Sequence, residues 1–127
     1  MIEYRDHITR QMLRDEPDIL FVFGDNMQRR GMGGQAFAMR GEPNAVGIPT
    51  KKSPSMRPEA FFNDHDHAAW YIESSPNIVR LLRHNGLIIW PKAGIGSGRA
   101  RLREMAPKIM KAIISIEVEL AYKEVTT

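Results

Sequence analysis

The chain has 127 residues, 43% of them hydrophobic and 26% charged, which is typical of an ordinary globular protein with one domain over residues 1–127. Its 18 Lys and Arg residues and 15 Asp and Glu residues give a net charge of +3, which permits an anionic ligand or a nucleic acid without requiring either. The sequence has no cysteine, no signal peptide and no apolar run of roughly 18 residues, which excludes disulfides and favours a cytoplasmic protein with no membrane partner.

The first half of the chain predicts two helices and two strands in alternation. Thr9 is a typical N-cap residue for a short helix that extends to residue 14. The continuous apolar run 19–23 is typical of a buried central strand. A short helix is expected within residues 34–40, and the run 45–48, which lies between two prolines, predicts a second strand.

The second half continues the alternation of helices and strands. Residues 66–73 and 76–83 are expected to form two separate helices, because Ser75 followed by a proline is typical of a new helix start. Residues 87–90 predict a third strand, and apolar residues spaced by three and four predict one amphipathic helix over 102–122. Together these elements predict a three-layer α/β domain with a mostly parallel or mixed sheet flanked by helices.

Two glycine-rich loops each follow a predicted strand and precede a predicted helix. Ligands of open α/β sheets bind outside the carboxyl ends of the strands. Glycine in such a loop allows positive φ and close backbone approach, and the N–H groups at a helix start attract an anion. Two such loops at equivalent places favour a phosphate or diphosphate site over ordinary turns. The glycines are Gly31, Gly33 and Gly34 in the first loop and Gly94, Gly96 and Gly98 in the second.

Half of the basic residues lie in or beside these two loops, which would raise the local concentration of an anionic ligand. For any one of them, a solvated basic surface is the alternative. The common nucleotide fingerprints are absent: the chain has no G-x-x-x-x-G-K-[ST], and residues 94–98 do not match G-x-G-x-x-G. The basic residues are Arg29, Arg30, Arg40, Lys51, Lys52, Lys92, Arg99, Arg101 and Arg103.

Three stretches of the chain, FVFGDNMQRRGMGGQA, GEPNAVGIPTK and WPKAGIGSG, resemble the macro-domain-like group, and specifically a set of short bacterial and phage proteins. Macro domains bind ADP-ribose, its derivatives or related NAD metabolites. The resemblance implies that Asn26 contacts a ribose, that Gly33 and Gly34 face the diphosphate, and that residues 94–98 close over it. The expected ligand-binding residues are Asn26, Gly31, Gly33, Gly34, Gln35, Gly94, Ile95, Gly96, Ser97, Gly98 and Arg99.

The chain departs from the macro-domain pattern at the adenine site. Many macro domains carry G-D-I-T, in which the Asp contacts the adenine amino group, whereas this chain has His7 at that place. The resemblance therefore implies that Asp6 or Asp25 would substitute if the base is adenine.

Asp25 is the candidate catalytic residue, because it is the carboxylate nearest the first glycine loop and could act as a general base. The alternative is a turn residue that bonds to backbone N–H groups of the loop. No metal or cofactor is expected. The stretch 63–67 (NDHDH) resembles a metal cluster, but histidines two apart point in different directions on a helix, and Asp64 or Asp66 suits a helix N-cap.

Three functional hypotheses follow. The first is a module that binds a small-molecule, ADP-ribose-like nucleotide. The second is a hydrolase on the same scaffold that releases ADP-ribose from a conjugate. The third, a nucleic-acid-binding protein, is less favoured because no aromatic residues alternate with the basic loops. The oligomeric state is left open by the sequence.

Overall fold

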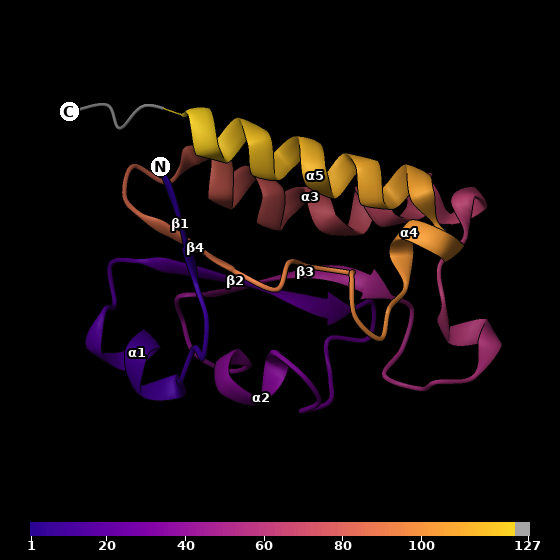
Figure 1. Cartoon of the computed structure of the whole chain (residues 1–127), viewed down its shortest axis with the longest axis horizontal. Coiled ribbons are helices and arrows are strands. Elements are labelled where there is room, and N and C mark those ends of the chain that lie inside the picture. Colours follow the sequence, from indigo (N-terminus) through magenta and orange to yellow (C-terminus); the bar gives the residue numbers. More distant parts are fainter. Residues whose placement is uncertain (124–127) are drawn as a thin grey trace.

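The computed structural model describes residues 1–123, within which four strands form one sheet with helices on both faces (Figure 1). The strand order is β1-β4-β2-β3, and every neighbouring pair is parallel. The predicted α/β class with three layers is therefore confirmed. The strands are β1 (Ile2–Arg5), β2 (Leu20–Asn26), β3 (Ala45–Lys51) and β4 (Ile88–Pro91).

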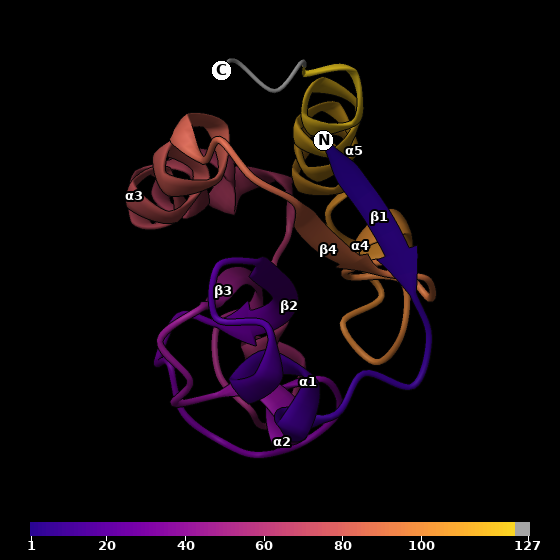
Figure 2. The same cartoon turned by 90° about the vertical axis from the view of Figure 1, so that its left-hand side faces the viewer.

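The helices divide between the two faces of the sheet (Figure 2). α1 (Arg10–Asp15) and α2 (Ala36–Met39) cover one face, and the long helices α3 (His67–Arg83) and α5 (Pro107–Tyr122) cover the other. A short helix, α4 (Leu102–Met105), precedes α5, and two 3₁₀ turns, η1 (Pro58–Ala60) and η2 (Asp64–Asp66), precede α3. Of the helices described, none is long and apolar enough to span a membrane.

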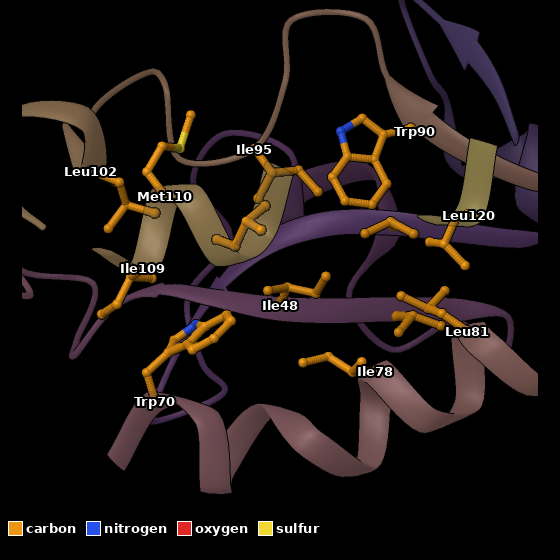
Figure 3. Close-up of a cluster of buried hydrophobic side chains, with 14 of the residues drawn as sticks. Ile48, Trp70, Ile78, Leu81, Trp90, Ile95, Leu102, Ile109, Met110 and Leu120 are labelled. Atoms are coloured by element: carbon orange, nitrogen blue, oxygen red, sulfur yellow. The ribbon is translucent and has the colours of Figure 1, made fainter. Parts of the chain in front are cut away.

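Each face of the sheet has its own hydrophobic core. Alternate residues of β2 supply the two cores, because side chains of a strand point to opposite faces in turn. Phe21 and Phe23 pack with α1 and α2, whereas Leu20 and Val22 pack in the larger core under α3 and α5. Figure 3 shows part of that larger core. Coverage on both sides explains why the predicted strand 19–23 is apolar throughout.

The three strands predicted from the sequence lie in one sheet, as expected. Two of them are longer than predicted, since β2 continues to Asn26 and β3 to Lys51. The strand β1 was not predicted, because only one of its four residues, Ile2, is apolar and it lies at the sheet edge. The predicted cap is confirmed: Oγ1 of Thr9 accepts the N–H of Met12 at 3.2 Å.

The predicted break between residues 73 and 76 is wrong, because α3 runs without interruption through Pro76. Ser75 does not cap a helix. Its hydroxyl donates to the carbonyl of Tyr71, one turn earlier, at 2.7 Å. A proline inside a helix removes one hydrogen bond, but burial of residues before and after it, including Trp70 and Leu81, keeps the two halves of α3 on the sheet.

The predicted single helix over 102–122 is instead two helices. The break falls at Ala106, whose φ of −145° and ψ of 68° are not helical. Pro107 then occupies the first position of α5, where the missing N–H costs no helical hydrogen bond.

The strands β2 and β4 separate towards their carboxyl ends. They are paired only where Leu20 meets Ile88 and Phe21 meets Ile89. Beyond that point β2 pairs with β3 alone and β4 with β1 alone. The chain leaves β2 for α2 on one face and leaves β4 for α4 and α5 on the other. This divergence is the topological switch point at which open α/β sheets bind their ligands.

Candidate functional site

A cleft of about 550 Å³ lies at the carboxyl ends of β2, β3 and β4. Its volume is in the range of small-molecule sites, roughly 300 to 1,000 Å³. Three loops form its walls: the first glycine loop after β2, the segment after β3, and the second glycine loop after β4. The lining residues are Gly24, Asp25, Asn26, Arg30, Gly31, Gly33, Gly34, Gln35, Ala36, Arg40, Thr50, Lys51, Ser53, Pro54, Met56, Ala93, Gly94, Gly96, Ser97, Gly98, Arg99 and Ala100.

The structure brings the two glycine loops together on this one cleft. Every residue predicted for the site lines it except Ile95. The side chain of Ile95 is buried in the larger core, where it lies near Trp90 and Ile48 (Figure 3). It therefore anchors the second loop on the sheet.

The glycine loops have backbone N–H groups that lack a protein partner in the described part of the chain. Gly31, Gly34, Gly94 and Gly96 have positive φ, a conformation that other residues adopt at a cost. Within residues 1–123, the N–H groups of Gly33, Gly34 and of residues 96–98 make no hydrogen bond. The following helices, α2 and α4, have four residues each, so a helix dipole contributes little at this cleft.

Gln35 bridges the gap where β2 and β4 separate. Its side-chain oxygen accepts the N–H of Gly24 at 2.8 Å, and its side-chain nitrogen donates to the carbonyl of Gly94 at 3.0 Å. The N–H of Leu20 donates to the carbonyl of Leu87, the residue before β4. The N–H of Gly24, four residues further along β2, faces the same way but has no strand partner. The amide of Gln35 takes the place of the missing strand and fixes the distance between the two glycine loops.

Asn26 closes the first glycine loop. Its side-chain nitrogen donates to the carbonyl of Arg30 at 2.7 Å, and its side-chain oxygen accepts the N–H of Gln28 at 3.0 Å. The residue is buried and lines the cleft. These contacts give Asn26 a structural role in the loop, while the ribose contact implied by the resemblance stays a prediction.

Asp25 lies in a cluster of ion pairs at the wall of the cleft. Its Oδ1 accepts the N–H of Asn26 at 2.8 Å and a guanidinium N–H of Arg40 at 2.5 Å. Its Oδ2 accepts a guanidinium N–H of Arg29 at 3.2 Å. The predicted alternative was a turn residue bonded to loop N–H groups, but Asp25 lies within β2, and its one backbone partner is the next residue of that strand. The catalytic role stays a prediction.

Arg40 joins this cluster to the first loop. Besides Asp25 it donates to the carbonyl of Gly31 at 2.7 Å, and its guanidinium lies 5.5 Å from the ring centre of Phe23. Asp25 and Arg40 also line a second cleft, of about 430 Å³, beside β3 and α3. The two cations of that cleft, Arg29 and Arg40, are both paired with carboxylates, so it lacks the unpaired positive charge of the main cleft.

The sequence analysis did not assign the segment after β3 to the site. Lys51, at the end of β3, is buried, and burial followed by the nearby charge of Arg99 lowers its pKa below the usual lysine value. Lys51 lines the cleft with Thr50, Ser53, Pro54 and Met56. The pairing of β3 with β2 was the signal: parallel neighbours end at the same edge, so the residues after β3 also face the cleft.

A smaller side cleft, of about 250 Å³, adjoins the main one. The two clefts share Gly34, Gln35 and Ala93. The side cleft is also lined by Asp6 and His7, and by Phe37, whose ring is 71% exposed.

The stretch 63–67 forms a helix cap. Asn63 accepts the N–H of His65 at 2.8 Å, and Asp66 accepts the N–H of Asn63 at 2.9 Å, which together make a capping box at η2. In the part of the chain that the structure describes, no group of three or more His, Cys, Asp or Glu side chains is placed to hold a metal ion.

No curated protein and no solved structure matches the chain. A family model, described as a family of unknown function (DUF7831), matches residues 3–116. This span includes β2, β3 and β4 and all three loops of the cleft. The chain therefore belongs to the DUF7831 family of unknown function.

Proposed function

We propose that the main cleft binds a small-molecule nucleotide that carries a diphosphate, of the kind represented by ADP-ribose and related NAD-derived compounds. One observation carries the proposal: the same cleft is lined by residues of both glycine loops whose N–H groups make no hydrogen bond within residues 1–123, and by cationic side chains that have no carboxylate partner. The cations are Arg30, Lys51 and Arg99, none of which has a carboxylate within 4.0 Å among residues 1–123.

Backbone N–H groups and cations together suit the oxygens of a diphosphate. Each N–H donates one directed hydrogen bond, and the guanidinium and ammonium groups neutralise the negative charge. The choice of ADP-ribose among diphosphate nucleotides rests on the resemblance to macro domains alone.

The side cleft supplies room for a base next to the diphosphate. A base there would reach the exposed ring of Phe37, on which it could stack, and the carboxylate of Asp6, which could accept a hydrogen bond from an exocyclic amino group. This arrangement supports a ligand longer than a phosphate alone.

Binding without turnover is favoured over hydrolysis. A general base must have a lone pair free to take a proton from water. Asp25 is buried and already accepts three hydrogen bonds, from Asn26, Arg40 and Arg29, so at most one lone pair is left for a water molecule.

Calorimetry with ADP-ribose, NAD and plain nucleotides at low salt tests the proposal. Gly33→Val is the best blocking variant, because a Cβ at Gly33 meets no protein atom within 4 Å and the side chain would extend into the cleft. We expect this variant to fold and to lose binding. Ala69→Val, on the exposed surface of α3, is the matched control and should bind normally.

If no diphosphate nucleotide produces heat or a melting shift, the proposal is wrong. If Gly33→Val binds as tightly as the wild type, the ligand lies outside this cleft. Release of free ADP-ribose from a conjugate would support the hydrolase hypothesis instead.

A further inference from the structure

Lys51 is a buried lysine with no acidic partner in the described part of the chain. Its ammonium donates to the carbonyl of Ser55 and to the sulfur of Met56, and lies 5.0 Å from the ring centre of Phe61. All three partners are neutral, and Lys51 is only 9% exposed. Burial of an ammonium without a counter-charge destabilises a protein, so the position needs an explanation.

Arg99 is the second cation at this end of the cleft. Arg99 lines the same cleft as Lys51, and its positive charge adds to burial in lowering the pKa of Lys51. The side chain of Arg99 is exposed and makes no hydrogen bond or ion pair within residues 1–123. By contrast, Arg40, which lines the same cleft, and Arg29, which lines the second cleft beside β3 and α3, are both paired with Asp25.

We propose that Lys51 and Arg99 together form the binding site for a phosphoryl group of the ligand. The inference rests on the proposed function of the cleft and adds where the anionic group is held: at the end of β3, between that strand and the second glycine loop. A dianionic phosphoryl group between the two side chains would remove their mutual repulsion and supply the counter-charge that buried Lys51 lacks.

The hydrogen bonds of Lys51 leave it able to bind such a group. An ammonium has three N–H donors, and Ser55 and Met56 account for two of them. The third N–H remains for a ligand oxygen. The same two contacts hold the segment after β3 against the cleft, and Pro54 of that segment lies beside Gly31 of the first loop.

Inorganic pyrophosphate is the probe that isolates this site, because it has the phosphoryl groups without a base or a sugar. Lys51→Met keeps the length of the side chain and removes its charge, and Arg99→Gln removes the second cation from an exposed position. Arg83→Gln, at the exposed end of α3, makes the same change in net charge away from the cleft. Calorimetry at low salt should show a loss of affinity of about tenfold or more for the first two variants and no change for the third.

The stability of Lys51→Met without ligand separates a binding role from a structural one. If Lys51 is retained for binding, removal of its buried charge leaves the melting temperature unchanged or higher. A lower melting temperature together with wild-type pyrophosphate affinity would overturn the proposal. Arg99→Gln decides the matter if Lys51→Met fails to fold, because Arg99 makes no side-chain contact that the fold needs.

The outcomes also separate this inference from the proposed function. Binding of pyrophosphate that depends on Lys51 and Arg99, without binding of any nucleotide, would support the phosphoryl site and overturn the nucleotide. Binding of a nucleotide with unchanged affinity in both variants would support the nucleotide and overturn the phosphoryl site. Absence of both kinds of binding would overturn both.

Discussion

Asp25 and Gly47 lie on neighbouring strands so close together that a Cβ on Gly47 would stand 2.5 Å from Oδ2 of Asp25. The carboxylate therefore occupies space that any other residue at position 47 would fill. Since the same carboxylate binds Arg29 and Arg40, the glycine in β3 is a condition for the ion pairs at the wall of the cleft.

Gly47→Ala should destabilise the protein by about 1–3 kcal/mol, because the added methyl group must displace Asp25 or the strand itself. Urea denaturation followed by circular dichroism measures the loss. Gly98→Ala is the control, since nothing lies within 4 Å of a Cβ there and its φ is not positive; it should change stability by less than about 0.5 kcal/mol. Equal stability of the two variants would show that Asp25 can move at no cost.

Replacement of Gln35 should open the gap between the glycine loops. Gln35→Met has a similar shape but neither accepts from Gly24 nor donates to Gly94, so it should lose about 1–3 kcal/mol of stability and expose the amide of Gly24 to hydrogen exchange. Gln35→Glu keeps an acceptor for Gly24 and loses only the donor for Gly94. It should retain the protection of the Gly24 amide. Unchanged exchange in Gln35→Met would contradict the bridging role.

Tyr4 should lose its proton at a higher pH than an ordinary tyrosine, and its hydrogen bond should stop stabilising the folded protein once that proton is lost. Its hydroxyl donates to Glu117 at 2.7 Å, and this hydrogen bond, followed by burial and the charge of Glu117, raises the pKa of Tyr4 from 10.0 to about 12. The unfolded chain loses this proton at a lower pH than the folded protein does. The contribution of the Tyr4 hydrogen bond to the free energy of unfolding is therefore complete below pH 10 and is lost as the pH rises to about 12.

Absorbance at 295 nm, recorded during a titration from neutral to alkaline pH, reports the ionisation of tyrosine directly. Tyr4→Phe should remove the late part of the curve, and Glu117→Gln should shift that part to lower pH. If the titration curve of Tyr4→Phe keeps the same late component as that of the wild type, the late ionisation does not belong to Tyr4.

Pro76→Ala should stabilise the protein by up to about 3 kcal/mol, because α3 is continuous at that position and the proline costs it a backbone hydrogen bond. Pro107→Ala should change the stability in the opposite direction. At the first position of α5 no hydrogen bond is regained, and the freer unfolded chain should reduce stability by about 0.4–1 kcal/mol. Urea denaturation of both variants measures the difference, and the same sign for both would be inconsistent with an uninterrupted α3.

The sequence predicted the parts of the site that depend on local pattern. Glycine clusters after apolar runs indicated two loops at strand ends, and the parallel sheet brings those loops together at one cleft. What the pattern could not show is how each polar side chain is used. Asn26 and Gln35 were expected to contact a ligand, but their amides bond to backbone groups of the protein, and such bonds depend on loop conformation.

Two errors in the predicted fold have the same cause, which is that tertiary contacts outweigh local propensity. α3 continues through Pro76 because side chains on either side of it are buried against the sheet. β1 forms from a mostly polar segment because β4 offers it an unpaired edge. Lys51 was counted among the basic residues near the glycine loops but not among the site residues, because the predicted strand ended three residues earlier, at Ile48.

Because β2 and β4 separate, the spacing of paired strands does not determine the width of the cleft. Hydrogen-bonded strands are held about 4.8 Å apart whatever their sequence. Past Phe21 and Ile89 that constraint ends, and the span between Gly24 and Gly94 is set by the length of one side chain, that of Gln35. A shorter or longer residue at this position would resize the cleft without breaking a single strand pair. If the cleft binds a ligand as proposed, substitutions at this one position would change the bulk of the ligand that it admits while the sheet is retained.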